Sequence, residues 1–366
     1  MKPSLYIHIP FCKAKCPYCS FPVVVGQDER RWAYLVELGR EMARHATTAV
    51  ATVHVGGGTP SFLSDADIAG LAAMVRKNFV AEEHAWACEL NPESVTRAKA
   101  EALKAAGFTR VSLGVQSFQE KYLRLLGRLH GRADALRAFE LLRAAGFKNI
   151  NVDVMFGFPG QATEELDADI DALVALGSEH VSLYALTVDE KSLFHARGVK
   201  VCDEQQADGY RRACARLNDA GLVQYEVSNF AREGFMSAHN LNYWQGGDYI
   251  GVGMGAHSHI DGVRSWNADT FPRYMAMMQA SGSAETGREQ LDAARKMMET
   301  FLFALRMVAG VDMAVLQQRF GCEFPRGCRD ELDALAAEGF IFKEGTRVRV
   351  TDKGRLVLDE IAARLI

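Results

Sequence analysis

One pattern recurs along the chain up to about residue 228 and constrains its fold more than any other feature. A helical stretch ends in a small residue and glycine, and a short β-rich run follows, as in AAGF at 105–108, AAGF at 144–147, LGSEH at 176–180 and DAGL at 219–222. Each glycine lies where a helix C-cap needs a left-handed residue. Strands that alternate with helices in this way are parallel and joined by crossover helices.

The pattern predicts six parallel strands, which begin near residues 5, 52, 86, 111, 151 and 181. The first three read LYIHI at 5–9, TVHV at 52–55 and HAWACEL at 84–90. In the helix expected over 29–46, the spacing places Trp32, Leu35, Val36 and Met42 on one face. We therefore predict an α/β fold with a partial (βα)6 barrel, rather than a complete barrel of eight strands.

Three domains are expected. After residue 228 the alternation stops, and 229–285 is rich in glycine, aromatic residues and histidine, which predicts a β-rich extension that carries HNLNYW. Residues 286–366 read as helices with two short strands around a turn, which predicts a winged-helix-like domain. The three domains are then the barrel of 1–228, the extension of 229–285 and this C-terminal domain. Winged helices often bind DNA, but the recognition segment here is acidic, so a packing or partner role is the better interpretation.

Composition excludes several classes of function. The net charge of -4 gives no basic field for nucleic acid. No run of apolar residues is long enough for a transmembrane segment, and the N-terminus is too short and too polar for a signal peptide. Eight cysteines without a secretion signal indicate reduced thiols in the cytoplasm. We therefore expect a soluble cytoplasmic protein.

Three of these cysteines are clustered. PFCKAKCPYCSF at 10–21 holds Cys12, Cys16 and Cys19, directly after the first predicted strand, where α/β barrels place their chemistry. Three thiolates can hold three irons of a 4Fe–4S cluster and leave the fourth iron open for a small-molecule chelate. A zinc ion completed by His8 and three unpaired cysteines are the alternatives.

Glycines and polar residues mark the ends of the next strands. GGGTP at 56–60 follows the second strand, and its backbone N–H groups and Thr59 hydroxyl can approach a ligand closely. Glu89, Gln116 and Asp153 interrupt the third, fourth and fifth strands near their ends. One such residue could simply be a polar residue of the barrel interior, but several in succession favour a ligand site. GVGMG at 251–255 lacks the βαβ context of a dinucleotide fingerprint.

On these motifs the chain resembles the radical S-adenosylmethionine superfamily. More narrowly, it resembles the oxygen-independent coproporphyrinogen III oxidase-like family through YIHIPFCKAKCPYC, HVGGGTPSFL, SLGVQSF, LGRLH, FGFPGQ, HNLNYW and GDYIGVGMGAHSH. In such proteins S-adenosylmethionine chelates the open iron, and an electron passed to its sulfonium yields a 5′-deoxyadenosyl radical. The resemblance therefore implies a 4Fe–4S cluster, S-adenosylmethionine and a low-potential electron donor such as flavodoxin.

Within that family two branches differ in these motifs. The true oxidases carry a fourth cysteine two residues beyond the third, where this chain has Phe21. HNLNYW is similar to the heme chaperone HemW branch, whose members are described as binding heme and passing it to acceptor proteins. The usual C-D-F-N of that branch reads Cys19-Ser20-Phe21-Pro22 here. The resemblance implies a heme chaperone, with a coproporphyrinogen oxidase or a related radical methyltransferase as the alternatives.

The resemblance also implies roles for single residues. It implies contacts with the S-adenosylmethionine on the cluster for Tyr6, Gly57 and Glu89. Positions that touch a second nucleotide or line the site in the oxidases are matched by Tyr18, Gly58, Thr59, Gln116, Arg128 and Asp153. Whether a second S-adenosylmethionine binds is left open. His239 of HNLNYW is the candidate heme ligand, because imidazole is a common axial ligand of heme iron.

Overall fold

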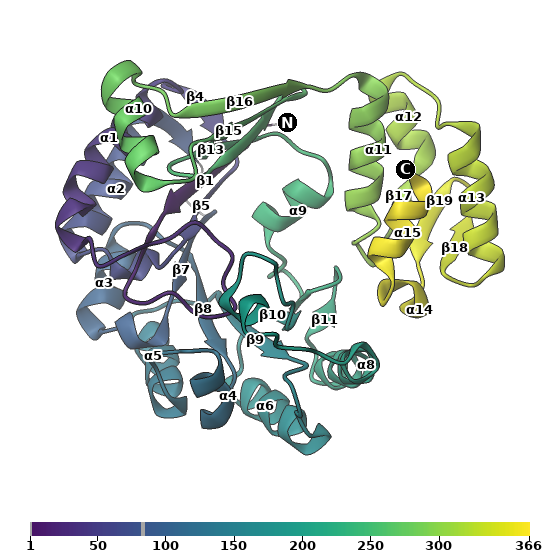
Figure 1. Cartoon of the computed structure of the whole chain (residues 1–366), viewed down its shortest axis with the longest axis horizontal. Coiled ribbons are helices and arrows are strands. Elements are labelled where there is room, and N and C mark those ends of the chain that lie inside the picture. The colour runs from purple at the N-terminus through teal and green to yellow at the C-terminus, as the bar shows by residue number, and fades with distance from the viewer. Residues whose placement is uncertain (1, 82–84) are drawn as a thin grey trace.

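The computed structural model describes residues 2–81 and 85–366, and its centre is a sheet of twelve strands (Figure 1). The six predicted parallel strands are neighbours in it, in the order β10-β9-β8-β7-β5-β1. Their bounds are β1 Ser4–Ile9, β5 Thr52–Gly57, β7 Trp86–Leu90, β8 Arg110–Gln116, β9 Ile150–Phe156 and β10 His180–Ala185. Residue 84 of the predicted third strand lies outside the described residues. The sheet has two free edges and does not close, so the predicted partial barrel is confirmed.

Helices cover the outer face of this sheet (Figure 1). They are α1 Arg31–Ala43, α2 Asp65–Asn78, α3 Arg97–Ala105, α5 Arg132–Ala144, α6 Thr163–Leu176 and α8 Asp203–Asp219. Two shorter helices, α4 Glu120–Leu125 and α7 Leu193–Ala196, contribute to a separate hydrophobic cluster. Gly107 and Gly146, the glycines of the two AAGF segments, have φ of +97° and +88°. These left-handed residues end α3 and α5 and turn the chain into β8 and β9, as the sequence pattern predicts. Among the described residues, no helix combines the length and the apolar character needed to cross a membrane.

The buried face of α1 differs from the predicted one. Leu35 and Met42 are buried, but Trp32 is 72% exposed and Val36 is 36% exposed, so the prediction was wrong for these two residues. The helix instead turns Tyr34 inward, where its hydroxyl donates to His8 O and accepts from Met254 N. These hydrogen bonds to two strand ends set the rotation of the helix.

The sheet continues beyond β1 with a strand that the sequence analysis did not separate from the extension. β13 (Tyr249–Val252) pairs in parallel with β1, and Tyr6 lies opposite Gly251. From β13 the sheet runs on through antiparallel strands, β14 His257–Ile260, β15 Val263–Asn267 and β16 Glu285–Gln290. The same region holds two helices, α9 Ala238–Trp244 and α10 Phe271–Ser281. At the other edge lie β11 Val223–Gln224 and β12 Asn229–Ala231, and short pairs form from β2 Phe11–Cys12, β3 Val24–Val25, β4 Thr48–Val50 and β6 Phe79–Ala81.

The C-terminal part lies to one side of the barrel and has a hydrophobic core of its own (Figure 1). It begins with α11 (Ala293–Ala304) and contains a three-stranded sheet of order β17-β19-β18. The remaining elements are β17 Val311–Asp312, α12 Met313–Phe320, α13 Arg326–Ala337, β18 Ile341–Glu344, β19 Arg347–Val350, α14 Asp352–Arg355 and α15 Leu358–Leu365. This arrangement confirms the winged-helix-like fold, while the exact domain boundaries stay a prediction.

Candidate functional site

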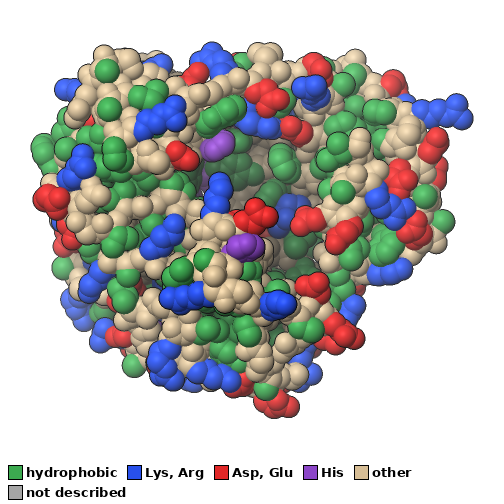
Figure 2. All heavy atoms as spheres, viewed as in Figure 1, with side chains coloured by type: hydrophobic (Ala, Val, Ile, Leu, Met, Phe, Trp, Pro, Cys, Tyr) green, Lys and Arg blue, Asp and Glu red, His purple; other side chains and the backbone are tan. Residues whose placement is uncertain are grey.

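A cavity of about 610 Å³ opens at the carboxyl ends of the parallel strands. The space-filling view shows a hollow in the molecule with charged side chains on its rim (Figure 2). Every site residue predicted from the sequence lines this one cavity, namely Tyr6, Cys12, Cys16, Tyr18, Cys19, Gly57, Gly58, Thr59, Glu89, Gln116, Arg128, Asp153 and His239. The fold thus brings these positions together, and their individual roles remain predictions.

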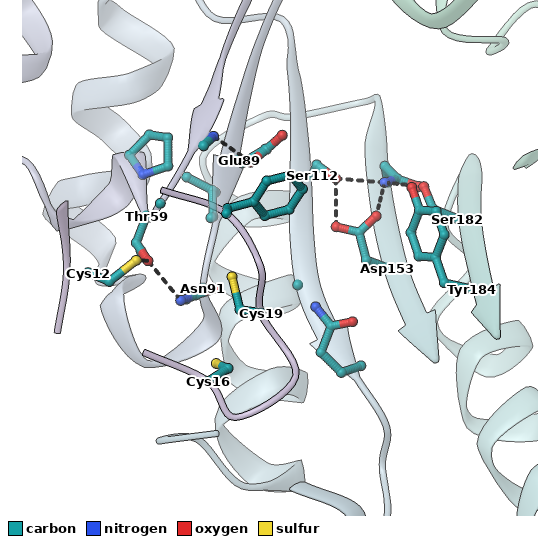
Figure 3. A pocket seen from close by; sticks show the side chains of 18 of the residues that line it. Cys12, Cys16, Cys19, Thr59, Glu89, Asn91, Ser112, Asp153, Ser182 and Tyr184 are labelled. Carbon is teal, nitrogen blue, oxygen red and sulfur yellow. Dashed lines mark hydrogen bonds between the residues drawn. The ribbon is translucent and has the colours of Figure 1, made fainter. Parts of the chain in front are cut away.

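The three cysteines lie at one end of the cavity (Figure 3). Cys12 ends β2, and the loop after it is tightened by a hydrogen bond from Cys19 N to Cys16 O of 3.0 Å. The Thr59 hydroxyl donates to Cys12 Sγ at 3.3 Å. Arg128 Nη1 lies 3.7 Å from Cys16 Sγ, so one thiol has a hydroxyl donor and another has a guanidinium beside it. Both donors would stabilise thiolates.

Burial affects the protonation of two of the three thiols. Burial raises the pKa of Cys12 to about 11 and also raises the pKa of Cys19. Without metal these thiols hold their protons, and cluster binding would displace them. In the part of the chain that the structure describes, no three side chains of His, Cys, Asp or Glu converge as a single metal ion requires. In a 4Fe–4S cluster each thiolate would bind its own iron.

This geometry argues against the alternative zinc site. His8 is only 4% exposed, and its ring nitrogens already face the Tyr6 hydroxyl at 3.1 Å and Pro22 O at 3.2 Å. It is therefore not available as a fourth ligand beside the three thiols.

The glycines of GGGTP form a close-fitting cradle next to the cysteines. Gly57 has φ of +111°, and a Cβ built on it would lie 2.5 Å from the His8 ring. A Cβ on Gly58 would meet the backbone of Pro10 at 2.7 Å. Side chains at these positions would collide with the end of β1 or strain the backbone. The packing of this loop against the end of β1 therefore requires glycine at both positions.

Glu89 places a negative charge on the cavity wall. Its Oε1 lies 2.9 Å from His54 Nε2, and its Oε2 accepts from Gly57 N at 3.1 Å. Burial raises the pKa of Glu89, but the hydrogen bonds from His54 and Gly57 lower it more, and the carboxyl titrates below its usual range. An ionised carboxylate in a cavity attracts a cationic group such as an ammonium or a sulfonium.

The opposite wall carries a second carboxyl group (Figure 3). Asp153 accepts hydrogen bonds from Ser112 at 3.0 Å and from Asn151 at 2.7 Å. Burial, followed by the charge of Glu89, raises the pKa of Asp153 above its ordinary value. At the end of β8, Gln116 has φ of +68°, and the pairing with β9 shifts by a residue beside it. This backbone conformation is uncommon for a residue other than glycine, and such strain is often found at functional sites.

His239 enters the cavity from α9. The residue is 5% exposed, and its Nδ1 lies 2.7 Å from Thr52 Oγ1 while its Nε2 lies 3.0 Å from the Tyr243 hydroxyl. Each ring nitrogen of His239 therefore has a hydroxyl partner. Burial, helped by the neighbouring His54, holds the pKa of His239 well below its usual value. The imidazole is therefore neutral, and a neutral imidazole is the form that binds a metal.

The sequence analysis missed several residues of the cavity wall. They are His54, Asn91, Arg110, Ser112, Asn151, Ser182, Tyr184 and Tyr243. His54 and Ser112 interrupt apolar strands just as Glu89 does, so the same signal was present for them. Asn91 follows β7 directly, and its Nδ2 donates to Thr59 Oγ1 at 3.1 Å.

Two family models match the chain. Residues 6–173 match the radical SAM superfamily, and residues 291–357 match the HemN C-terminal domain. The chain is 33% identical to the heme chaperone HemW of Bacillus subtilis, over 98% of this chain and 97% of that protein. It is 36% identical to the heme chaperone HemW of Mycobacterium tuberculosis, over 99% of this chain and 94% of that protein. It is 34% identical to the heme chaperone HemW of Escherichia coli, over 98% of this chain and 96% of that protein.

A solved structure has the same fold along the whole chain. It is the coproporphyrinogen III oxidase HemN of Escherichia coli, described as a radical SAM enzyme, with a TM-score of 0.89 and 24% identity. The likeness covers 100% of this chain and 90% of that one. At this level of identity the similarity shows the fold alone.

Proposed function

We propose that this chain, which belongs to the heme chaperone HemW family of radical SAM proteins, binds heme and transfers it to acceptor proteins. The observation that carries the proposal is the cavity, which is lined both by the three cysteines and by the histidine of HNLNYW. Full-length relatives named as heme chaperones support the same assignment.

The proposal includes two cofactors. Cys12, Cys16 and Cys19 would hold a 4Fe–4S cluster, and Glu89 with the Gly57 backbone would bind the cationic end of S-adenosylmethionine. When bound, the cluster would supply low-potential electron transfer, which needs a donor such as flavodoxin. All eight cysteines are free, which suits the reducing cytoplasm where we place the protein.

His239 would bind the heme iron through Nε2. In the structure this nitrogen lies 3.0 Å from the Tyr243 hydroxyl, so the phenol must turn aside before iron can reach it. On the other side, the hydrogen bond between Nδ1 and Thr52 orients the ring. Such a partner on the remote nitrogen is usual for histidine ligands of metals.

The enzymatic alternative has less support. The true oxidases carry a fourth cysteine where this chain has Phe21, and that side chain is 62% exposed and lines the cavity. The likeness to HemN shows the fold and carries no information about the substrate. We therefore do not propose coproporphyrinogen decarboxylation or methyl transfer for this chain.

The test is an anaerobic heme titration of the cluster-reconstituted protein, followed in the Soret band. We expect saturation at equimolar heme, and an affinity at least about tenfold weaker for His239→Ala, since even the neighbours of metal ligands contribute that much. The matched variant Tyr243→Phe keeps the ring but removes the hydroxyl that competes for Nε2, so its affinity should equal or exceed that of the parent. If heme does not saturate, the proposal fails, and product formation from coproporphyrinogen would favour the oxidase.

A further inference from the structure

His54 lines the cavity but has no role in the function proposed above. It lies in β5 between Val53 and Val55, whose side chains are buried in the core behind the sheet. In the register of β5 and β7, His54 lies opposite Ala87, and its ring reaches diagonally along β7 to Glu89. One of its ring nitrogens is therefore held by the carboxylate expected to bind the nucleotide.

The same ring lies against the candidate heme ligand. The centroids of His54 and His239 are 4.9 Å apart, and the two imidazole planes differ by 23°. On the nucleotide side, Tyr6 stacks on His54 at 6.1 Å and 20°. His54 thus contacts both parts of the cavity, through a hydrogen bond on one side and ring stacking on the other.

Glu89 can accept a cation without giving up its present contacts. His54 holds one carboxylate oxygen and Gly57 N holds the other, yet 39% of the side chain is still exposed to the cavity. The carboxyl is ionised at neutral pH because its pKa lies below the usual range. S-adenosylmethionine carries a net positive charge, so its arrival would cancel the charge that faces His54.

The charge at Glu89 matters at His239 because His239 is buried and the carboxylate faces the same cavity. A carboxylate that accepts the His54 N–H makes that imidazole richer in electrons, and such a ring stacks favourably on an imidazole that is bound to iron. A cation at Glu89 removes this polarisation and adds repulsion toward the positive iron. The lost polarisation and the added repulsion both weaken heme binding. Both are weakly screened, because the interior has a low dielectric constant.

We propose that His54 couples the two sites, so that S-adenosylmethionine bound at Glu89 weakens the binding of heme at His239. The inference rests on the proposed function. Nucleotide binding would then favour the release of heme to an acceptor. Because binding free energies are linked, heme must weaken nucleotide binding by the same factor.

The experiment measures heme affinity of the cluster-reconstituted protein by anaerobic Soret titration, with and without saturating S-adenosylmethionine. In the parent chain we expect the nucleotide to raise the heme Kd by at least about fivefold, the lower end of usual coupling between sites. In His54→Phe, which keeps a stacking ring without the N–H, the factor should fall below about twofold. His54→Gln keeps an N–H donor for Glu89 without the ring and should lose the coupling as well.

A matched control lies outside the cavity. His257 is exposed and stacks on Trp266 at 6.1 Å and 26°, so His257→Phe removes a stacked imidazole that touches neither site. This control should keep the coupling of the parent chain. The second readout is the S-adenosylmethionine affinity with and without heme, which must change by the same factor.

The outcomes separate the inference from the function on which it rests. Saturable heme binding that S-adenosylmethionine leaves unchanged, or tightens, would overturn the coupling and leave the chaperone proposal standing. Coupling that persists in both His54 variants would overturn the role of His54. No saturable heme binding in any protein would overturn both proposals. Circular dichroism of each variant excludes misfolding as the cause of a lost response.

Discussion

At the scale of single residues, buried histidines keep their neutral form through complete hydrogen bonding. His180 is fully buried, and its Nδ1 lies 2.7 Å from Asn151 Oδ1 while its Nε2 lies 2.8 Å from the Tyr225 hydroxyl. Burial, followed by the charge of Arg110, holds the pKa of His180 well below its usual value. Asn151 also bonds Asp153, so this histidine supports the far wall of the cavity from behind.

His180 makes stability depend on pH. Its folded pKa is depressed, so below about pH 6.5 the unfolded chain binds a proton that the folded chain does not. The free energy of unfolding should therefore fall as the pH drops, by up to about 1.4 kcal/mol per pH unit from this group. Urea unfolding of His180→Gln at several pH values should show a shallower fall, and the exposed His195→Gln should match the parent. An equal slope in His180→Gln and the parent would contradict the assignment.

Gly57 is the residue whose replacement should affect the nucleotide site most directly. Its φ of +111° disfavours any side chain, and a Cβ would press into the His8 ring at 2.5 Å. Gly57→Ala should lower the stability by about 1–3 kcal/mol and weaken S-adenosylmethionine binding. Gly70→Ala on α2 is the control, since its Cβ would meet nothing within 4 Å. Binding by Gly57→Ala as tight as by the parent would show that the cradle is not needed.

At the scale of elements, α1 fixes the end of β13 through a buried carboxyl. Glu41 accepts from Gly253 N at 2.9 Å and from the Tyr274 hydroxyl at 2.6 Å. Its pKa is raised by burial, although these hydrogen bonds oppose the shift. GVGMG is therefore a structural turn: its Gly253 has φ of +104° and leads β13 back out of the sheet beside His8.

Removal of this carboxyl should loosen the link between α1 and β13. Glu41→Ala leaves several buried donors without an acceptor, each of which costs about 1–3 kcal/mol. Glu41→Gln retains an acceptor oxygen of the same shape and should lose much less stability. Chemical denaturation of the two variants compares them directly. Equal losses would mean that packing volume, and not the hydrogen bonds, is what Glu41 contributes.

The same elements show how far sequence reasoning reached. The glycine caps helped to predict the later parallel strands, because the left-handed Gly107, Gly146 and Gly177 end α3, α5 and α6 before the chain enters the next strand. β13 was not predicted because it has only four residues and contains Gly251, which weakens any strand pattern. Tyr34 was missed on the buried face of α1 because its hydroxyl contacts lie on distant strands.

The candidate site was predictable where a motif is local. Cys12 and Gly57 stand in short runs whose spacing carries the signal. The contact between His54 and Glu89 depends on the register of β5 against β7, and the stacking of His54 on His239 depends on how α9 enters the barrel. Neither of these can be read from one sequence, since a shift in register by one residue would turn His54 to the other face.

At the scale of the whole molecule, an ion pair with a buried carboxylate links the barrel to the C-terminal part. Glu226 has a side chain with no exposed surface, and Arg306 Nη2 lies 3.4 Å from its Oε2. The guanidinium also lies 4.6 Å from the ring of Trp244, the last residue of HNLNYW. Backbone pairing between Glu226 and Met307 completes the junction. The helix that carries His239 is thus attached to the joint between the two cores.

This junction gives a last prediction. Arg306→Met leaves Glu226 buried without its counterion, which should cost about 3–5 kcal/mol of stability. Burial raises the pKa of Glu226 even with Arg306 present, so without the arginine the carboxyl should hold its proton more strongly still. A proton removes the unpaired charge, so the loss of stability in Arg306→Met should shrink as the pH falls from about 8 to about 5.

The double variant Arg306→Met with Glu226→Gln should recover part of the lost stability at neutral pH, because the amide has no charge to bury. Urea unfolding monitored by tryptophan fluorescence would measure all three proteins. A single variant within about 0.5 kcal/mol of the parent would show that the ion pair contributes little to holding the two parts together.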